Sequence, residues 1–435
     1  MQTLISIIIA LIIFSVLVVF HEFGHFIVAR LNGVVVEEFS VGMGPRLLKH
    51  KSKKSGTVYS LKAFPIGGSC AMLGEDEDNE EEGSFNSKSV WRRLSIVFAG
   101  PFFNFVLAFF LALIVIASVG SDPSTVVSVD QSSNAYKAGL RKGDYITNYD
   151  GTHVSIGREM YLEDFVAPID GSMMKLSFKR DGKSYTIHYK PDAVKKYILG
   201  MSYTSGSNAP TISQVTKDSA FEKAGVKRGD IVMKIDGVAV KTGEAVAKYL
   251  VAHPLDGKVV NVLLKRNNKT YSVKVKPIEQ NVYSPGFIYN MARVRQDFFG
   301  TIRYSFVEMR YQVMAVLKSL KMLVTGKVAA EEVSGPVGIV KVIGDTYKET
   351  RTQGFGITLL SLVSLAILLS ANLGVMNLLP IPALDGGRIL LYIVEIVTRK
   401  KIPRDKEGAI HFVGFIILMA LMVLLVFNDV RKIFF

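Results

Sequence analysis

The sequence predicts a polytopic α-helical membrane protein with four transmembrane helices and two small extracytoplasmic α/β domains in tandem. Three observations support this fold class. The chain has 435 residues, 49% of them hydrophobic, and a mean hydropathy of +0.29, which is too apolar for a typical soluble or disordered chain. Four runs are apolar enough to cross a bilayer. The long segment between the second and third runs contains an internal repeat.

The four apolar runs predict transmembrane helices at residues 1–30, 94–120, 355–380 and 409–427. A helix needs about 20 apolar residues to span the hydrocarbon core. The first run carries no charged side chain before His21. A cleaved signal peptide is the alternative for this run. It is disfavoured because no Lys or Arg opens the chain and no small-residue cleavage site follows the run.

Lysine and arginine gather in the two short loops, which predicts the orientation of the chain. The loops at 31–93 and about 381–408 are rich in both residues, so the positive-inside rule places them in the cytoplasm. The long segment 121–354 then lies outside the cytoplasm. Arg431 and Lys432 would also lie outside, which is a mild exception to the rule.

The net charge and the single cysteine indicate which binding partners and which metal sites to expect. The formal net charge is +14, but no basic helix or aromatic-rich RNA motif gathers the positive residues. We therefore expect anionic lipid head groups of the bilayer as counter-charges, and no nucleic acid. The single cysteine, Cys70, excludes a disulfide framework and a cysteine-based zinc cluster.

Two stretches of the outer segment recur 86 residues further along the chain. KAGLRKGDYITNYDG (137–151) matches KAGVKRGDIVMKIDG (223–237), and KRDGKSYTIHYKP (179–191) matches KRNNKTYSVKVKP (265–277). The pattern predicts two domains of short strands around Gly-Asp and Asp-Gly turns, at 122–200 and 207–280. It resembles bacterial PDZ domains, which bind an extended peptide by strand addition. LGMSY (199–203) is the best candidate for the loop that holds a peptide carboxylate; a spacer or steric filter is the alternative.

Two further segments are apolar without being spans. Apolar residues recur at helical spacing over 298–325, which predicts an amphipathic helix on the outer membrane surface. A helix packed on the second repeat is the alternative. TVYSLKAFPIGGSCAMLGE (57–75) is too apolar for a plain loop and predicts a β-hairpin that enters the membrane, with an edge that an unwound substrate could pair with.

The chemistry starts with His21-Glu22-Phe23-Gly24-His25 at the inner end of the first span. Histidines four residues apart share one face of a helix, so both imidazoles can bind one metal. Glu22 would take a proton from a metal-activated water. The alternative is a group of polar residues that anchors the helix at the membrane interface.

A catalytic zinc needs a third protein ligand and an open position. Asp385 in NLLPIPALDGGR (377–388) is the candidate, because the first and third spans run in the same direction and place both motifs at the inner end. Asn377 is predicted to bind the substrate carbonyl, or else to bond another helix. Asn104 in AGPFFN (99–104) has the same two interpretations. The structural one is favoured there, with Gly100 allowing close helix approach.

These motifs occur together in one order, and together they resemble the bacterial site-2 protease family, in its RseP-like branch with two PDZ domains. The resemblance implies that His21, His25 and Asp385 bind Zn²⁺ and that Glu22 is the catalytic acid/base. It implies a substrate-binding or oxyanion role for Asn377. It also implies a membrane-reentrant β-loop at 57–75, within the cytoplasmic loop 31–93.

The resemblance implies an intramembrane zinc metalloendopeptidase of the bacterial inner membrane. Its active site would lie near the cytoplasmic face. Its substrates would be single-pass proteins such as trimmed anti-sigma factors, and signal-peptide remnants, with the PDZ pair excluding bulky outer domains. One alternative is a non-catalytic PDZ adaptor that captures peptides, although the intact Glu22 argues against it. The other is a metal transporter, although no chain of polar residues leads onward from the histidines.

Overall fold

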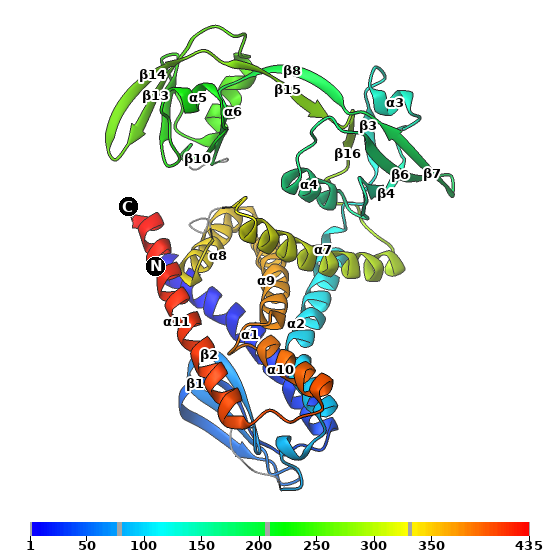
Figure 1. Ribbon diagram of the computed structural model, residues 1–435, viewed down its shortest axis with the longest axis vertical. Helices are drawn as coiled ribbons and strands as arrows, with labels where there is room; N and C mark the ends of the chain where they lie inside the picture. Colours follow the sequence, from blue (N-terminus) through cyan, green and yellow to red (C-terminus); the bar gives the residue numbers. More distant parts are fainter. Residues whose placement is uncertain (1, 76–80, 205–208, 329–332, 435) are drawn as a thin grey trace. The chain divides into compact units, whose positions relative to one another are not determined.

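The computed structural model describes residues 2–75, 81–204, 209–328 and 333–434. The chain divides into two compact units (Figure 1). The helical unit consists of Met1–Pro123, Ser155–Leu162 and Met291–Phe435. The repeat unit consists of Ser124–Val154 and Glu163–Asn290.

In the described part of the chain, four helices are long and apolar enough to cross a membrane. They are α1 (Gln2–Leu31), α2 (Val90–Val119), α9 (Phe355–Leu378) and α11 (Arg404–Phe434). Each covers one of the four apolar runs. α1 packs on α2 and α2 packs on α9, while most of the apolar surface of α11 is exposed. Such exposure suits a helix surrounded by lipid, where apolar side chains need no protein cover.

The described residues of the helical unit also form α7 (Phe298–Val324), α8 (Pro336–Thr350) and α10 (Asp385–Thr398). The first covers the segment predicted to be an amphipathic helix. The sequence analysis did not predict α8 or α10. The chain breaks between α9 and α10, where Pro380 and Pro382 lack the backbone N–H that a continuous helix needs.

β1 (Val36–Lys51) and β2 (Val58–Met72) form the sheet of the helical unit, and a short 3₁₀ turn follows at Phe85–Ser87. The prediction placed a hairpin within 57–75, whereas the structure pairs that segment with 36–51. The first part of β1 lies between two parts of β2, because Phe39 is a partner of both Tyr59 and Cys70. The two arms of the predicted hairpin therefore do not pair with each other, and the hairpin prediction is wrong: both arms pair with the first part of β1, which lies between them.

The two repeats fold alike. Each has a four-stranded sheet, in the orders β5-β4-β6-β7 and β12-β11-β13-β14. Arg180 bonds Asp144 at 2.6 Å and Arg266 bonds Asp230 at 2.6 Å, in corresponding positions of the two copies. The elements of the first copy are α3 (Asn134–Lys137), β4 (Tyr145–Tyr149), β5 (Thr152–His153), α4 (Gly157–Val166), β6 (Met174–Arg180) and β7 (Lys183–Tyr189). Those of the second are α5 (Ala220–Lys223), β11 (Ile231–Ile235), β12 (Val238–Ala239), α6 (Gly243–Ala252), β13 (Val260–Arg266) and β14 (Lys269–Val275).

Short strands outside the matched motifs change the expected tandem arrangement. β9 (Met201–Tyr203) pairs with β10 (Ile212–Val215) of the second repeat. The corresponding partner of β3 (Val126–Val129) in the first repeat is β16 (Phe287–Tyr289), which follows the second repeat in sequence. β8 (Asp192–Ile198) and β15 (Ile278–Ser284) pair with each other between the two. The second repeat is thus inserted in the first, whereas the sequence predicted consecutive domains at 122–200 and 207–280.

Candidate metal centre

Two glycines allow α2 to pack directly on the histidine face of α1. His21 and His25 are each 8% exposed. A Cβ at Gly24 would lie 2.4 Å from the carbonyl oxygen of Ala99, and a Cβ at Gly100 would lie 2.3 Å from His25 Nε2. The space that a side chain would occupy at Gly100 is therefore filled by an imidazole. The close approach of helices predicted at Gly100 is therefore a contact between α2 and the imidazole rings of α1.

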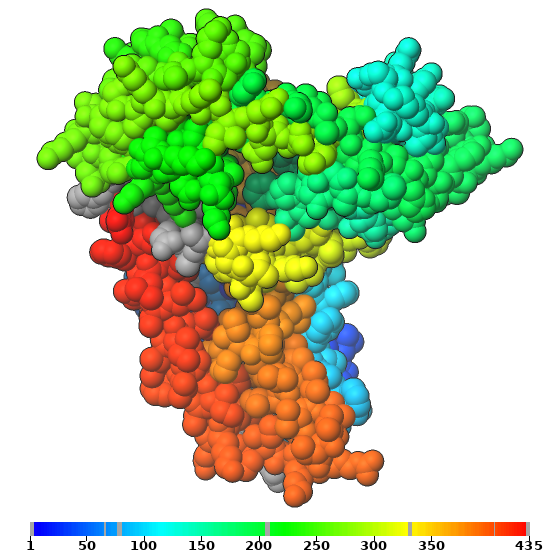
Figure 2. All heavy atoms as spheres, turned by 45° about the horizontal axis from the view of Figure 1, so that its top comes forward, coloured from blue at the N-terminus to red at the C-terminus, as the bar shows by residue number. Residues whose placement is uncertain are grey.

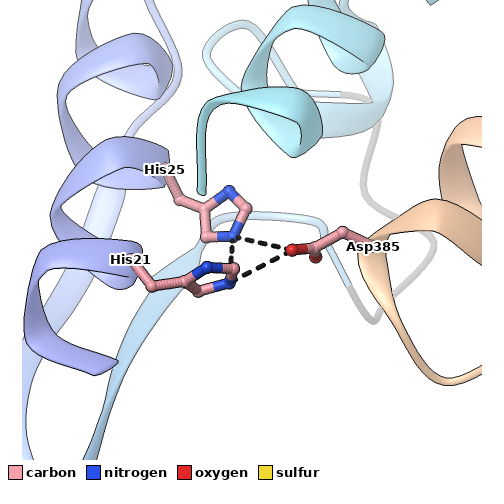
Figure 3. A group of neighbouring side chains, drawn as sticks. All are labelled: His21, His25 and Asp385. Atoms are coloured by element: carbon pink, nitrogen blue, oxygen red, sulfur yellow. Dashed lines mark hydrogen bonds and ion pairs between the residues drawn. The ribbon is translucent and has the colours of Figure 1, made fainter. Parts of the chain in front are cut away.

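The structure brings His21, His25 and Asp385 together (Figure 3). His21 Nε2 lies 3.1 Å from Asp385 Oδ2, and His25 Nε2 lies 3.6 Å from the same oxygen. The two Nε2 atoms are 3.2 Å apart. Tetrahedral zinc has bonds of about 2.0–2.1 Å to such ligands, which sets neighbouring ligand atoms about 3.3 Å apart. The three atoms thus have the spacing of one face of a zinc tetrahedron, and among the described residues no further His, Cys, Asp or Glu joins the group.

Asp385 reaches this position because the loop before it folds tightly onto the first turn of α10. A Cβ at Gly386 would lie 2.1 Å from the carbonyl oxygen of Leu379, and one at Gly387 would lie 2.6 Å from that of Ile381. The Gly-Gly pair is therefore required by the backbone fold rather than by the chemistry.

Partners of the Nδ1 atoms orient the two imidazoles. His25 Nδ1 donates a hydrogen bond to the Ile96 carbonyl at 2.9 Å, which leaves the lone pair of Nε2 for a metal. His21 Nδ1 lies 3.1 Å from the amide nitrogen of Asn104 and 3.5 Å from that of Asn377. Asn104 is fully buried, whereas Asn377 is partly exposed. The buried amide is the closer partner of His21, and the partly exposed one is left nearer to an incoming substrate.

Sequence reasoning left two roles open for Asn104 and favoured the structural one, a bond between helices. Gly100 and Asn104 are four residues apart and therefore share one face of α2. That spacing is the signal from which the contact with His21 could have been predicted. Choosing His21 rather than another helix as the partner requires the packing of α1 on α2.

Glu22 directly follows His21 in α1 and lies near His25 and Asp385. β2 passes over it, because a Cβ at Gly68 would lie 3.5 Å from Glu22 Cγ and 3.0 Å from the Ser40 carbonyl oxygen. The structure therefore brings together three side chains that could hold a metal ion, a carboxylate next to them and a strand edge close by. A site with these parts can activate water for hydrolysis.

The comparisons with known proteins agree with this chemistry. The family model of peptidase family M50 matches residues 9–421. Zinc metalloprotease RasP of Geobacillus kaustophilus is 31% identical over 100% of this chain and 99% of the relative. Regulator of sigma-W protease RasP of Bacillus subtilis is 28% identical over 98% of each chain. A protein of Clostridium acetobutylicum, provisionally named a zinc metalloprotease, is 33% identical over 98% of this chain and 97% of its own length.

Among solved structures, the HtrA3 PDZ domain bound to a phage-derived ligand covers 21% of this chain and 92% of that domain. The identity is 16% and the TM-score 0.18.

Proposed function

The chain belongs to peptidase family M50 and is a site-2-type zinc metalloprotease, and from this premise we propose that it cleaves peptide bonds within the membrane plane. His21, His25 and Asp385 would hold the zinc ion, and Glu22 would be the catalytic acid/base. One observation carries the proposal: ligand atoms from the first span and from the start of α10, 360 residues apart, lie within 4.8 Å of one another. Such polar groups at a membrane helix are costly unless they share a function.

Zinc, when bound, activates a water molecule and polarises the substrate carbonyl. Glu22 takes the proton from the attacking water and delivers it to the amide nitrogen that leaves. The amide of Asn377 donates a hydrogen bond to the carbonyl oxygen as negative charge develops on it. Asn104 holds the His21 ring. With Nε2 used as a ligand, Nδ1 carries the hydrogen, so Asn104 presents its amide oxygen to it.

Substrate presentation falls to the β1–β2 sheet. A substrate helix hides its carbonyls in internal hydrogen bonds, so it must unwind before attack. The part of β2 at Gly68 lies beside Glu22, and a strand edge supplies unpaired backbone groups to an extended chain. We propose that the unwound substrate pairs with this edge and so places a carbonyl next to Glu22.

The substrates we propose are single-pass membrane proteins already trimmed outside, including anti-sigma factors, and signal-peptide remnants. The protein is an inner-membrane protein. The distribution of Lys and Arg supports an active site near the cytoplasmic face and repeats on the outer side. The name of the Bacillus subtilis relative, regulator of sigma-W protease, supports the anti-sigma class.

For the two repeats we propose a filter that excludes substrates with bulky outer domains. A specific observation favours a second candidate, which is capture of a peptide end. A groove in the second repeat runs between β9 and α6, and its lining includes Leu199, Gly200, Met201, Leu250 and Val251. This groove contains the predicted LGMSY loop, and PDZ-like domains bind extended peptides by strand addition.

The variant Glu22→Gln tests the catalytic assignment. It should keep zinc while the cleavage of co-expressed single-pass substrates falls by about 10²–10⁴, because proton transfer is lost. Glu82→Gln, at an exposed position, is the matched control and should cleave like the wild type. Cleavage at the wild-type rate by Glu22→Gln would remove Glu22 from the chemistry. A wild-type protein that holds zinc and cuts no substrate of the panel would favour the peptide-capturing adaptor.

A further inference from the structure

Two buried positions of helix α11 contact the rest of the helical unit. Among its residues whose side chains are described, only Gly414 and Asp429 are buried. Asp429 accepts hydrogen bonds from the backbone N–H groups of Gly335 at 3.0 Å and Gly338 at 2.7 Å, at the start of α8. In Figure 2, α11 is the red helix exposed along the face shown. The second attachment, at Gly414, is to the loop that leads to Asp385.

His411 and Gly414 make this second attachment together. They are three residues apart and so lie on one face of the helix. The backbone N–H of Ala383 donates a hydrogen bond to His411 Nδ1 at 2.9 Å. A Cβ at Gly414 would lie 2.4 Å from Pro382 Cβ and 2.5 Å from its carbonyl oxygen. α11 therefore contacts Ala383 and Pro382, which lie two and three positions before Asp385.

The loop that α11 contacts holds one residue in an unfavourable conformation. Ala383 has φ +74°, a left-handed conformation that is unfavourable for any residue with a Cβ and persists only where the surroundings enforce it. The loop has a turn bond of its own, from the Leu384 N–H to the Ile381 carbonyl at 3.2 Å, but Pro380 and Pro382 have no N–H to add to it. The N–H of Ala383 finds its acceptor on α11. Loss of that acceptor would let Ala383 relax and would move the backbone that aims Asp385.

We infer that His411 and Gly414 are positioning residues of the metal centre: through Ala383 and Pro382 they hold Asp385 at its distance from His21 and His25. This inference rests on the proposed role of Asp385 as a ligand. It assigns a task to the fourth span, because α11 supplies none of the three metal-binding side chains. The geometry of the third ligand then depends on where one end of α11 sits.

Zinc affinity of the full chain in detergent tests the inference. Metal is removed, and zinc is titrated against a competing chelator. The visible absorption of the Co²⁺-loaded protein reports the geometry of the site. His411→Leu should weaken zinc binding about 10–100-fold, as does the loss of other groups that orient metal ligands. It should also change the Co²⁺ spectrum. His411→Asn places an amide oxygen where Nδ1 stood and should stay within a few-fold of wild type.

Two further comparisons separate positioning from general stability. Ala383→Gly in the His411→Leu background should restore much of the affinity, because glycine adopts positive φ without steric cost. Gly414→Ala should weaken zinc binding, whereas Gly408→Ala on the same helix should not, because nothing lies within 4 Å of a Cβ at Gly408.

Zinc affinity and the Co²⁺ spectrum of these variants decide the inference. Wild-type zinc affinity and an unchanged Co²⁺ spectrum in both His411→Leu and Gly414→Ala would overturn the inference. The inference would also fail if His411→Leu and His411→Asn lose the same zinc affinity and Ala383→Gly in the His411→Leu background does not restore it. If His411→Leu fails to accumulate, the Gly414 and Gly408 pair decides. Asp385→Ala separates the proposed ligand set from the positioning role. If this variant binds zinc like the wild type, the proposed ligand set fails. If it loses zinc affinity, the other variants test the positioning role alone.

Discussion

At the scale of single residues, the candidate metal centre requires glycines, which leave space for its neighbours, as much as it requires the side chains that could bind a metal. The imidazole of His25 occupies the space that a Cβ at Gly100 would need. The tight backbone at Gly386 and Gly387 lets α10 begin at Asp385. A site assembled this way cannot relax around an added methyl group, because the neighbours are the proposed ligands and the backbone.

Gly100→Ala is therefore expected to abolish zinc binding. The added Cβ would lie 2.3 Å from His25 Nε2 and 2.8 Å from His21 Cε1, so at least one imidazole must leave its position. Alanine favours helix over glycine by about 1 kcal/mol, so α2 itself should persist. Zinc content of the purified protein measures the effect. The control is Gly356→Ala in α9, where nothing lies within 4 Å of a Cβ. Stoichiometric zinc in Gly100→Ala would contradict the packing described here.

Asp385 and Asn377 should give different signatures when each is changed to alanine. Asp385→Ala should lower zinc affinity, because two imidazoles alone are an incomplete site. Asn377→Ala should keep zinc but lose about 10²–10³ in turnover, as is typical for the loss of one oxyanion donor. Metal analysis and cleavage rates on the same preparations separate the two. Equal zinc in Asp385→Ala and wild type would remove Asp385 from the site.

Sequence reasoning predicted the spatial grouping of this site. The spacing of His21 and His25 places both on one helix face, and topology predicts that Asp385 meets them; the structure brings the three together. The contact of Asn104 with His21 was not predicted, because an asparagine on α2 faces α1 only once the two helices are packed. The contacts of His411 and Gly414 depend in the same way on where α11 lies.

At the scale of elements, α7 carries a buried ionic face that its apolar periodicity does not reveal. Arg158 bonds Glu308 at 2.5 Å and Asp122 at 2.9 Å, while Arg310 bonds Glu159 at 2.5 Å. The sequence predicted the helix from its spacing of apolar residues. The partner of Glu308 lies 150 residues away in sequence, so no local pattern could have predicted the pair.

Arg158→Met should destabilise the protein by about 3–5 kcal/mol, because it removes the nearest cation from two buried carboxylates, Glu308 and Asp122. Burial by itself raises the pKa of Glu308, but Arg158 holds it below its usual range. A carboxyl with a lowered folded pKa stabilises fully above its ordinary pKa of 4.5, and this contribution is lost as the pH falls through the folded value. Thermal unfolding in detergent at pH 7 and pH 4 measures both effects.

In the wild type, stability should fall between these two pH values. In Arg158→Met the unpaired Glu308 is easier to protonate, so the fall should be smaller. Arg303→Met, at an exposed position on the same helix, is the control and should unfold like the wild type. The buried pair would lose its assigned role if Arg158→Met matched that control at both pH values.

At the scale of the whole chain, the repeats could be predicted and their connection could not. The matched motifs contain the turns and the long strands of each sheet, so both copies are visible in the sequence. β16 has three residues and lies outside the motifs. Its pairing with β3 across the inserted second repeat is therefore invisible to a search for similarity. The pairing of β8 with β15 now shows where the second repeat can be removed without opening the first.

Removal of the second repeat separates a filter from a capture site. Ile198 and Ile278 are directly paired at one end of the β8–β15 ribbon, so an Asn-Gly turn can replace residues 199–277 and close a hairpin there. The β3–β16 pairing of the first repeat is kept in this variant. If the repeats exclude bulky substrates, it should cut untrimmed substrates faster than wild type and trimmed ones at an unchanged rate. If the groove captures peptide ends, it should cut trimmed substrates more slowly.

Val251→Glu provides the matched point variant, because Val251 lines the groove and is 81% exposed. The new carboxylate repels a peptide carboxylate, so a capture site should lose activity on trimmed substrates while a filter should not change. Val238→Glu makes the same substitution in the same repeat, at a position 49% exposed and outside the groove lining. We expect both point variants to cut trimmed substrates like the wild type. A loss in Val251→Glu that Val238→Glu lacks, together with no gain on untrimmed substrates when 199–277 is removed, would refute the filter and support capture.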